Sequence, residues 1–207
     1  MIEAKGQTNL TVVGNANQVE AQAAYGISDA VALQVNFGRV QPKKEDNGNS
    51  GSGRLFEAGL GYFRHVRPSV LFDVYALAGV GTVDNDFPSA LAGNPGTTGK
   101  ISADMTRFSL QPSISFQRRR VSISGSTRLS SLQYRNIEGS LIFGGENQVK
   151  YLTDNKSNFL VEPAVTLRVG GEKLRLQVQI VRSVNLSNSD FKQDKSLGTV
   201  GLNFNFR

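Results

Sequence analysis

The last eleven residues, LGTVGLNFNFR (197–207), decide the fold class of this chain. Successive side chains of a strand point to opposite faces, so Val200, Leu202, Phe204 and Phe206 share one face. From Thr199 onward, the other face carries Thr199, Gly201, Asn203, Asn205 and Arg207. An apolar face tipped with aromatic side chains and backed by a polar face is typical of the final strand of a transmembrane β-barrel.

The composition agrees with one β-barrel domain over residues 1–207. Hydrophobic residues make up 39% of the chain, and no run reaches the roughly 18 apolar residues that a membrane-spanning helix needs. Cysteine is absent, which excludes disulfides, thiol nucleophiles and thiolate metal sites. No apolar signal segment follows Met1, so we expect a secreted protein to be numbered here from its mature or truncated form.

Ten alternating segments can be traced along the chain between turn signals, and none has a helical period. Short turns alternate with long polar links, of which the longest span 41–53, 84–104 and 136–157. Outer-membrane barrels have short periplasmic turns and long extracellular loops. The sequence therefore predicts an all-β, ten-stranded antiparallel up-and-down barrel in a bacterial outer membrane, with both termini periplasmic. The expected strands are 5–13, 18–27, 31–40, 54–66, 69–83, 105–117, 121–135, 158–170, 173–186 and 196–207.

The apolar faces of these segments place aromatic residues at two heights with aliphatic residues between them. Phe37, Phe56, Phe108 and Phe159 fall near the long-loop end, and residues such as Tyr62 and Phe116 fall near the short-turn end. Two aromatic girdles around an aliphatic band are typical of a surface that faces lipid. A soluble ligand-binding barrel is the alternative, but it has no reason to segregate its aromatic residues by height.

The opposite faces should line the lumen, and they are polar. We expect four acids and four arginines there to neutralise one another and to seal the lumen. A pair of catalytic carboxylates or a narrow charged pore are alternatives. Lumenal glycines at 59, 61, 79 and 81 could make room for the arginines or for a small cavity. The predicted lumenal charge network consists of Glu20, Glu57, Asp73, Glu162, Arg107, Arg128, Arg168 and Arg175.

Most of the net charge of +6 gathers near the short turns. Anionic headgroups of the inner leaflet are the expected partner of this rim, and an acidic periplasmic protein is the alternative. Nucleic acid is not expected, because the basic residues lack interleaved aromatic residues and a binding motif. The predicted basic rim consists of Arg64, Arg67, Arg118, Arg119, Arg120, Lys173 and Arg207.

No pattern in the chain points to catalysis, a cofactor or a metal. His65, the one histidine, lies beside a short turn, away from any predicted lumenal acid. Asp84-Asn85-Asp86 lacks the glycine and the distal glutamate of a calcium loop. The sequence therefore predicts that the protein is not an enzyme.

The loop 136–157 is too apolar for a freely solvated link. It could extend its hairpin above the membrane, fold back as a plug, or contact another protein, since exposed apolar patches mark interfaces. The candidate partner-contact residues are Leu141, Ile142, Phe143, Tyr151 and Leu152.

Six short strings occur in order along the chain: Glu3–Gln7, Gly59–Phe63, Arg107–Phe116, Phe159–Arg168, Gly171–Lys173 and Gly201–Phe204. Together they resemble the small outer-membrane β-barrel lipoproteins of the Bacteroidota type over nearly the whole chain. This resemblance implies a lipid-modified cysteine shortly upstream of the barrel, which the sequence lacks, and it supplies no catalytic residues.

The functional hypothesis from the sequence is a structural or accessory subunit of an envelope complex, with other outer-membrane proteins as candidate partners. A narrow pore or small-ligand transporter is the second hypothesis, and a membrane-embedded enzyme is the third.

Overall fold

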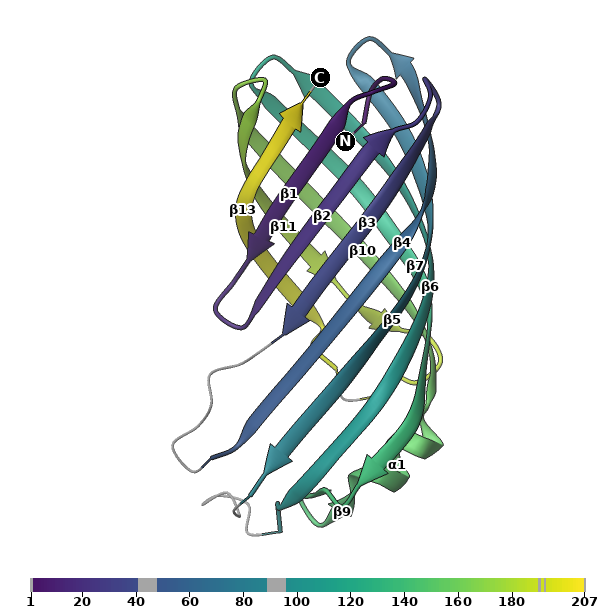
Figure 1. The fold of residues 1–207 in the computed structure, drawn as a ribbon, viewed down its shortest axis with the longest axis vertical. Coiled ribbons are helices and arrows are strands. Elements are labelled where there is room, and N and C mark those ends of the chain that lie inside the picture. Colours follow the sequence, from purple (N-terminus) through teal and green to yellow (C-terminus); the bar gives the residue numbers. More distant parts are fainter. Residues whose placement is uncertain (1, 41–47, 89–95, 190, 192, 207) are drawn as a thin grey trace.

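The computed structural model is a closed antiparallel β-barrel whose axis runs along the longest dimension of the molecule (Figure 1). It describes residues 2–40, 48–88, 96–189, 191 and 193–206. The barrel strands are β1 (Thr8–Gly14), β2 (Gln18–Gly26), β3 (Val31–Val40), β4 (Ser50–Arg67), β5 (Val70–Phe87), β6 (Gly99–Arg118), β7 (Val121–Gly139), β10 (Ser157–Gly170), β11 (Leu174–Arg182) and β13 (Ser196–Phe206).

The last strand closes the barrel, as the sequence predicts. β13 pairs on one side with β11 and on the other with β1, where Leu10 lies opposite Phe204. Each remaining strand pairs with its neighbours in chain order. The predicted ninth strand, 173–186, is interrupted at Ser183, so that β12 (Val184–Asn185) is separate and pairs with β10 alone. The predicted ten-stranded up-and-down topology is confirmed.

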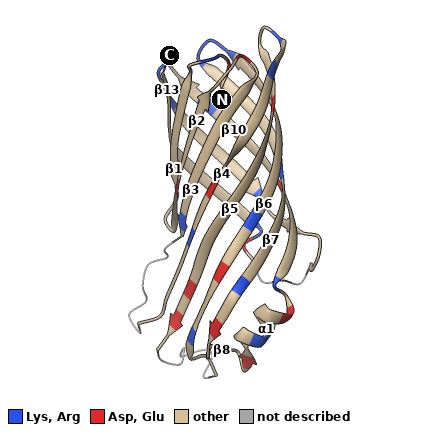
Figure 2. Ribbon diagram, turned by 45° about the vertical axis from the view of Figure 1, so that its right-hand side comes forward, with Lys and Arg blue, Asp and Glu red and all other residues tan. Residues whose placement is uncertain are grey.

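The outer face of the barrel is apolar over a broad band. Leucine, valine, isoleucine and phenylalanine side chains of every barrel strand are exposed there, which is the reverse of a soluble barrel. Charged residues gather toward the two ends, and the ribbon between them is largely uncharged (Figure 2). None of the described helices is both long and apolar enough to cross a membrane.

Strands β4 to β7 continue well past the long-loop ends of their neighbours and form a curved wall on one side of the barrel mouth (Figure 1). They take up parts of the ranges 41–53, 84–104 and 136–157, which the sequence analysis treats as loops; residues 41–47 and 89–95 lie outside the described part. On this extension the arrangement of apolar side chains outside and polar side chains inside is reversed. Asp84 and Ser102 point outward and are exposed, whereas Ile101 and Ala103 point inward and are buried.

A compact cap covers the inner side of this wall. It consists of the hairpin β8 (Ile142–Phe143) and β9 (Glu146–Asn147) and the short helix α1 (Gln148–Asp154). The Asn147 side chain caps the helix by accepting a hydrogen bond from the Lys150 backbone N–H at 3.1 Å. Lys150 and Asp154, one helical turn apart, form an exposed ion pair at 2.8 Å, which raises the pKa of Lys150.

Candidate functional site: the barrel lumen

Apolar side chains fill the short-turn end of the lumen on the side of β2 to β5, and buried polar side chains such as Arg175 and Ser122 lie at the same end on β11 and β7. The N-terminal segment folds under the barrel and buries Ile2 against inward-facing residues of β2 to β5, among them Phe63 and Leu71. The Gly6 backbone N–H donates to the Gly26 carbonyl at 2.8 Å, which fixes this segment to the end of β2. We call this cluster the apolar plug; its members are Ile2, Ala24, Ala32, Phe63, Leu71, Tyr75 and Leu77.

Farther along the lumen, four charged side chains form one ion-pair cluster. Glu57 lies 3.0 Å from Arg128 Nη1 and 3.8 Å from Arg107 Nε, and Arg107 also pairs with Glu162. Arg107 donates further hydrogen bonds to Ser130 at 2.9 and 3.1 Å. Glu57 is only 2% exposed, and buried charges of this kind persist when they are paired and hydrogen-bonded.

The other four members of the predicted charge network lie in the lumen but form no ion pair with a described residue. Asp73 accepts a hydrogen bond from Ser113 at 2.5 Å, and Arg168 donates to Gln177 at 2.7 Å. Arg175 donates to Gln117 at 3.2 Å, and Glu20 accepts from Gln18 at 3.0 Å. The structure therefore brings four of the predicted charges together, namely Glu57, Glu162, Arg107 and Arg128. The remaining four, Glu20, Asp73, Arg168 and Arg175, form hydrogen bonds with uncharged side chains.

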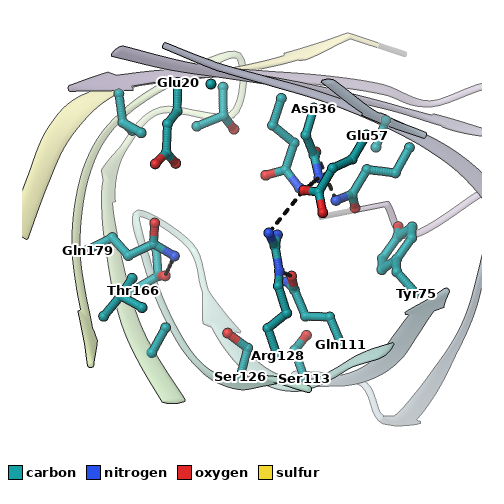
Figure 3. A pocket seen from close by; sticks show the side chains of 18 of the residues that line it. Glu20, Asn36, Glu57, Tyr75, Gln111, Ser113, Ser126, Arg128, Thr166 and Gln179 are labelled. Atoms are coloured by element: carbon teal, nitrogen blue, oxygen red, sulfur yellow. Dashed lines mark hydrogen bonds and ion pairs between the residues drawn. The ribbon is translucent and has the colours of Figure 1, made fainter. Parts of the chain in front are cut away.

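All of these charged residues except Arg175 line a cavity of about 260 Å³. Tyr75 and Ala24 of the apolar plug border it, and its lining extends to Gly38 and Leu197 near the long-loop ends of β3 and β13. Its lining also includes Asp73, Ser115 and Arg168 near the short-turn ends of β5, β6 and β10, so the cavity continues beside the plug toward that end. Figure 3 shows Glu20 and Gln179 on one wall and Glu57, Asn36 and Tyr75 on another, with Arg128 reaching between them.

Amide and hydroxyl side chains dominate the walls of this cavity. Arg128 Nε donates to the side-chain oxygen Oε1 of Gln111 at 2.7 Å, and Gln179 Nε2 donates to Thr166 Oγ1 at 3.0 Å. Such groups both donate and accept, so they suit a small solute with hydroxyl or amide groups. No group of three or more His, Asp or Glu residues within the described part of the chain could hold a metal ion.

Two lumenal glycines make the close packing of larger side chains possible. A Cβ atom on Gly79 would lie 2.6 Å from Glu57 Cγ, and one on Gly61 would lie 2.4 Å from the Tyr75 ring. From the sequence, such glycines are expected to make room for arginines or for a small cavity. In the structure they instead accommodate a glutamate of the ion-pair cluster and a tyrosine of the apolar plug.

A polar seam joins the first and last strands inside the barrel. The Asn203 side-chain amide donates to Asn9 at 2.9 Å and to Thr11 at 2.6 Å, and Asn9 donates to Asn205 at 2.5 Å. Asn203 is only 1% exposed. Sequence reasoning placed Asn203 and Asn205 in the lumen but missed Asn9 and Thr11, although their alternation with Leu10 and Val12 carried the signal.

The predicted basic rim lies at the short-turn end, where its described members are exposed. Arg119 has the positive φ of 40° that the tight turn between β6 and β7 requires. His65 is also exposed, beside a register shift in the pairing of β4 with β5. The exposed members of the rim are Arg64, Arg67, Arg118, Arg119, Arg120 and Lys173, and Arg207 lies outside the described residues.

The candidate partner-contact residues divide into two groups. Leu141 is buried, and the Tyr151 ring stacks on Phe191 with centroids 5.9 Å apart, while Leu152 is half-buried. Ile142 and Phe143 remain 40% and 38% exposed at the hairpin of the cap. Much of the apolar content of the loop therefore packs within the chain itself.

Comparisons with solved structures agree with this architecture. The outer membrane protease OmpT from Escherichia coli aligns with a TM-score of 0.57 at 8% identity, over 97% of this chain and 92% of its own. The fold is that of outer-membrane β-barrels. A major outer membrane protein from Thermus thermophilus aligns over 97% of this chain and 99% of its own with a TM-score of 0.44 at 10% identity. The KdgM porin aligns over the same shares with a TM-score of 0.40 at 7% identity.

No protein-family model matches the chain, and no curated protein matches its sequence. The structural alignment with OmpT supports the resemblance to outer-membrane barrels at the level of fold. The Bacteroidota type and the lipid anchor stay predictions.

The prediction that the protein is not an enzyme is wrong, because the same fold occurs in an outer-membrane enzyme. OmpT is a protease with the same fold. At 8% identity the shared fold carries none of that protein's residues to this one. The absence of a recognisable catalytic motif from this sequence therefore does not exclude any class of enzymatic activity.

Proposed function

We propose that the protein is an integral outer-membrane barrel whose lumen binds a small, hydroxyl-rich polar solute from the long-loop side. The observation that carries this proposal is the cavity itself, which has amide-rich walls and is bordered by Ala24 and Tyr75 of the apolar plug. A solute of about the size of a monosaccharide fits such a volume. Because the apolar plug and buried polar side chains such as Arg175 and Ser122 pack the short-turn end, the geometry favours a binding pocket over a continuous pore.

The orientation in the membrane belongs to the same proposal. Both termini lie at one end together with the turns that join β2 to β3, β4 to β5, β6 to β7 and β10 to β11 (Figure 1), and short turns are periplasmic in barrels of this kind. The exposed arginines of the basic rim would then face the anionic headgroups of the inner leaflet, at about 1 kcal/mol per well-placed charge. The cavity mouth and the cap would face outward.

Fluorescence offers a direct test, since the chain contains no tryptophan. A Tyr75→Trp variant places a reporter at the border of the cavity, and a Tyr62→Trp variant places one on the outer face. Titration with glucose, N-acetylglucosamine, glycine and glutamate should give a saturable change with a sugar in the first variant alone. A Ser126→Phe substitution, which fills the cavity, should abolish it.

Two results would contradict the proposed pocket. One is a Tyr75→Trp variant whose emission responds to none of these solutes. The other is an equal response from the Tyr62→Trp variant, because that reporter cannot sense the lumen.

The accessory-subunit hypothesis is a second candidate, favoured by the exposed Ile142 and Phe143 at the cap. Crosslinking in native membranes tests it. A neighbouring protein should crosslink near residue 143, and its yield should fall in an Ile142→Ser, Phe143→Ser variant. A chain that crosslinks to nothing would contradict this role.

A further inference from the structure

Two arginines lie directly opposite each other on the outer face of the barrel, near the long-loop end. Arg39 on β3 pairs in register with Arg54 on β4, and both are exposed. Neither forms an ion pair with a described residue. Like charges in directly opposite positions destabilise an antiparallel pair. An anion bound between the two guanidinium groups would remove that repulsion.

The cross-strand pair one step nearer the membrane band is aromatic. Phe37 lies opposite Phe56, and the two are 44% and 48% exposed. Beyond them Val80 on β5 lies opposite Phe56 and is likewise exposed. A phosphate at the arginine pair would therefore carry any attached acyl chain onto an apolar surface that is continuous with the band.

A groove lies beside the arginine pair and includes Arg54, though not Arg39, in its lining. It has a volume of about 480 Å³ and runs over β3 to β7. Its outward-facing lining includes Phe37, Phe56 and Val80 on the membrane side and Arg54 and Arg135 beyond them, with Thr82 between. Arg54 Nε donates to Thr82 Oγ1 at 3.0 Å, which holds the arginine side chain over the groove and leaves its terminal NH₂ groups for a ligand.

Two acidic residues lie near the groove, but neither forms an ion pair with these arginines. Asp104 also lines it, and its carboxylate accepts a hydrogen bond from Asn136 at 2.7 Å. Asp84 lies one step farther out on β5, opposite Ser52. Neither carboxylate lies within ion-pair distance of a described arginine.

We propose that Arg39 and Arg54 bind a phosphate of an anionic glycolipid in the leaflet at the long-loop end, with an acyl chain on Phe37 and Phe56. Guanidinium groups bind phosphate by paired, charge-assisted hydrogen bonds, and two of them can share one phosphate. Under the proposed orientation this leaflet is the outer one, so we commit to a phosphorylated glucosamine lipid rather than a phospholipid. The inference rests on the membrane location but not on the lumenal ligand.

Native mass spectrometry of the full chain in detergent tests this site. The probes are diphosphorylated lipid A, its dephosphorylated counterpart and phosphatidylglycerol. The wild type should retain the diphosphorylated lipid preferentially. Arg39→Gln and Arg54→Gln should each weaken its binding about tenfold, the loss expected for one charge-assisted hydrogen-bonded contact. Arg182→Gln, at an exposed arginine near the long-loop end of β11, is the matched control and should bind as the wild type does.

Three outcomes would overturn the proposal. They are equal retention of the phosphorylated and dephosphorylated lipids, preferential retention of phosphatidylglycerol, and equal losses in the Arg54→Gln and Arg182→Gln variants. Because the measurement does not involve the lumen, it can fail while the proposed solute binding holds, and the reverse is also possible.

Discussion

Replacement of Arg107 by methionine should destabilise the barrel more than any other single arginine substitution in the lumen. Arg107 contacts both Glu57 and Glu162, and the side chains of these three residues are 12%, 3% and 17% exposed. The Arg107→Met variant leaves Glu162 without a cation and Glu57 with Arg128 alone. Removing one partner of a buried pair costs about 3–5 kcal/mol. We expect a cost of about 3 kcal/mol, at the lower end of that range, because the adjacent cavity lets water reach part of the cluster.

Guanidinium-induced unfolding of the protein in lipid vesicles, followed by circular dichroism, measures this cost. The matched control is Arg168→Met, which removes a lumenal arginine that has Gln177 as its partner and no described ion pair. That change should cost no more than about 1 kcal/mol. Adding Glu162→Gln to the Arg107→Met variant should restore about 1–2 kcal/mol, since it removes the orphaned charge. Equal destabilisation by Arg107→Met and Arg168→Met would refute the reasoning.

Three further predictions concern packing, the seam and the cap. Gly79→Ala should cost about 1–3 kcal/mol in the same unfolding assay, because its Cβ would lie 2.6 Å from Glu57 Cγ. Gly125→Ala, whose Cβ would meet nothing within 4 Å, should leave the stability unchanged. Equal costs for the two variants would contradict this prediction. Asn203→Leu should cost about 1–3 kcal/mol by removing the amide that donates to Asn9 and Thr11. Asn17→Leu should have little effect, because the Asn17 side chain is exposed at a turn and forms no hydrogen bond with a described residue. Tyr151→Ala removes the stacking on Phe191 and should speed proteolysis within residues 140–156 without shifting global unfolding; unchanged cleavage would count against the packed cap.

The sequence reveals the lipid-facing half of this fold because the bilayer acts on every strand in the same way. Side chains that point outward within the band are mainly apolar. Residues such as Leu202 and Phe206 therefore indicate a transmembrane β-barrel and show which side chains of a strand point outward. The same logic fails on the extension of β4 to β7. There water lies outside and the cap lies inside, so polar residues such as Asp84 point outward and apolar residues such as Ile101 point inward. In the sequence, this reversed alternation makes the segment look like an irregular loop.

The lumenal contacts depend on information that periodicity does not contain. Glu57 and Arg128 are 71 positions apart and meet only because of the register and tilt of the strands between them. Parity alone could place both in the lumen, but it could not distinguish the four charges that pair from the four that do not. The apolar plug was missed for a related reason. Ile2 precedes the first strand, and Phe63 and Leu71 interrupt faces that are otherwise polar.

Single-channel conductance in planar bilayers tests most directly whether the lumen is a pocket closed at the short-turn end. Insertion can be monitored in parallel by the altered gel mobility of the folded barrel before heating. With insertion established, the account predicts no stable conductance steps, because the apolar plug and buried polar side chains such as Arg175 and Ser122 pack the short-turn end. Regular ohmic steps from the inserted wild-type protein would contradict it.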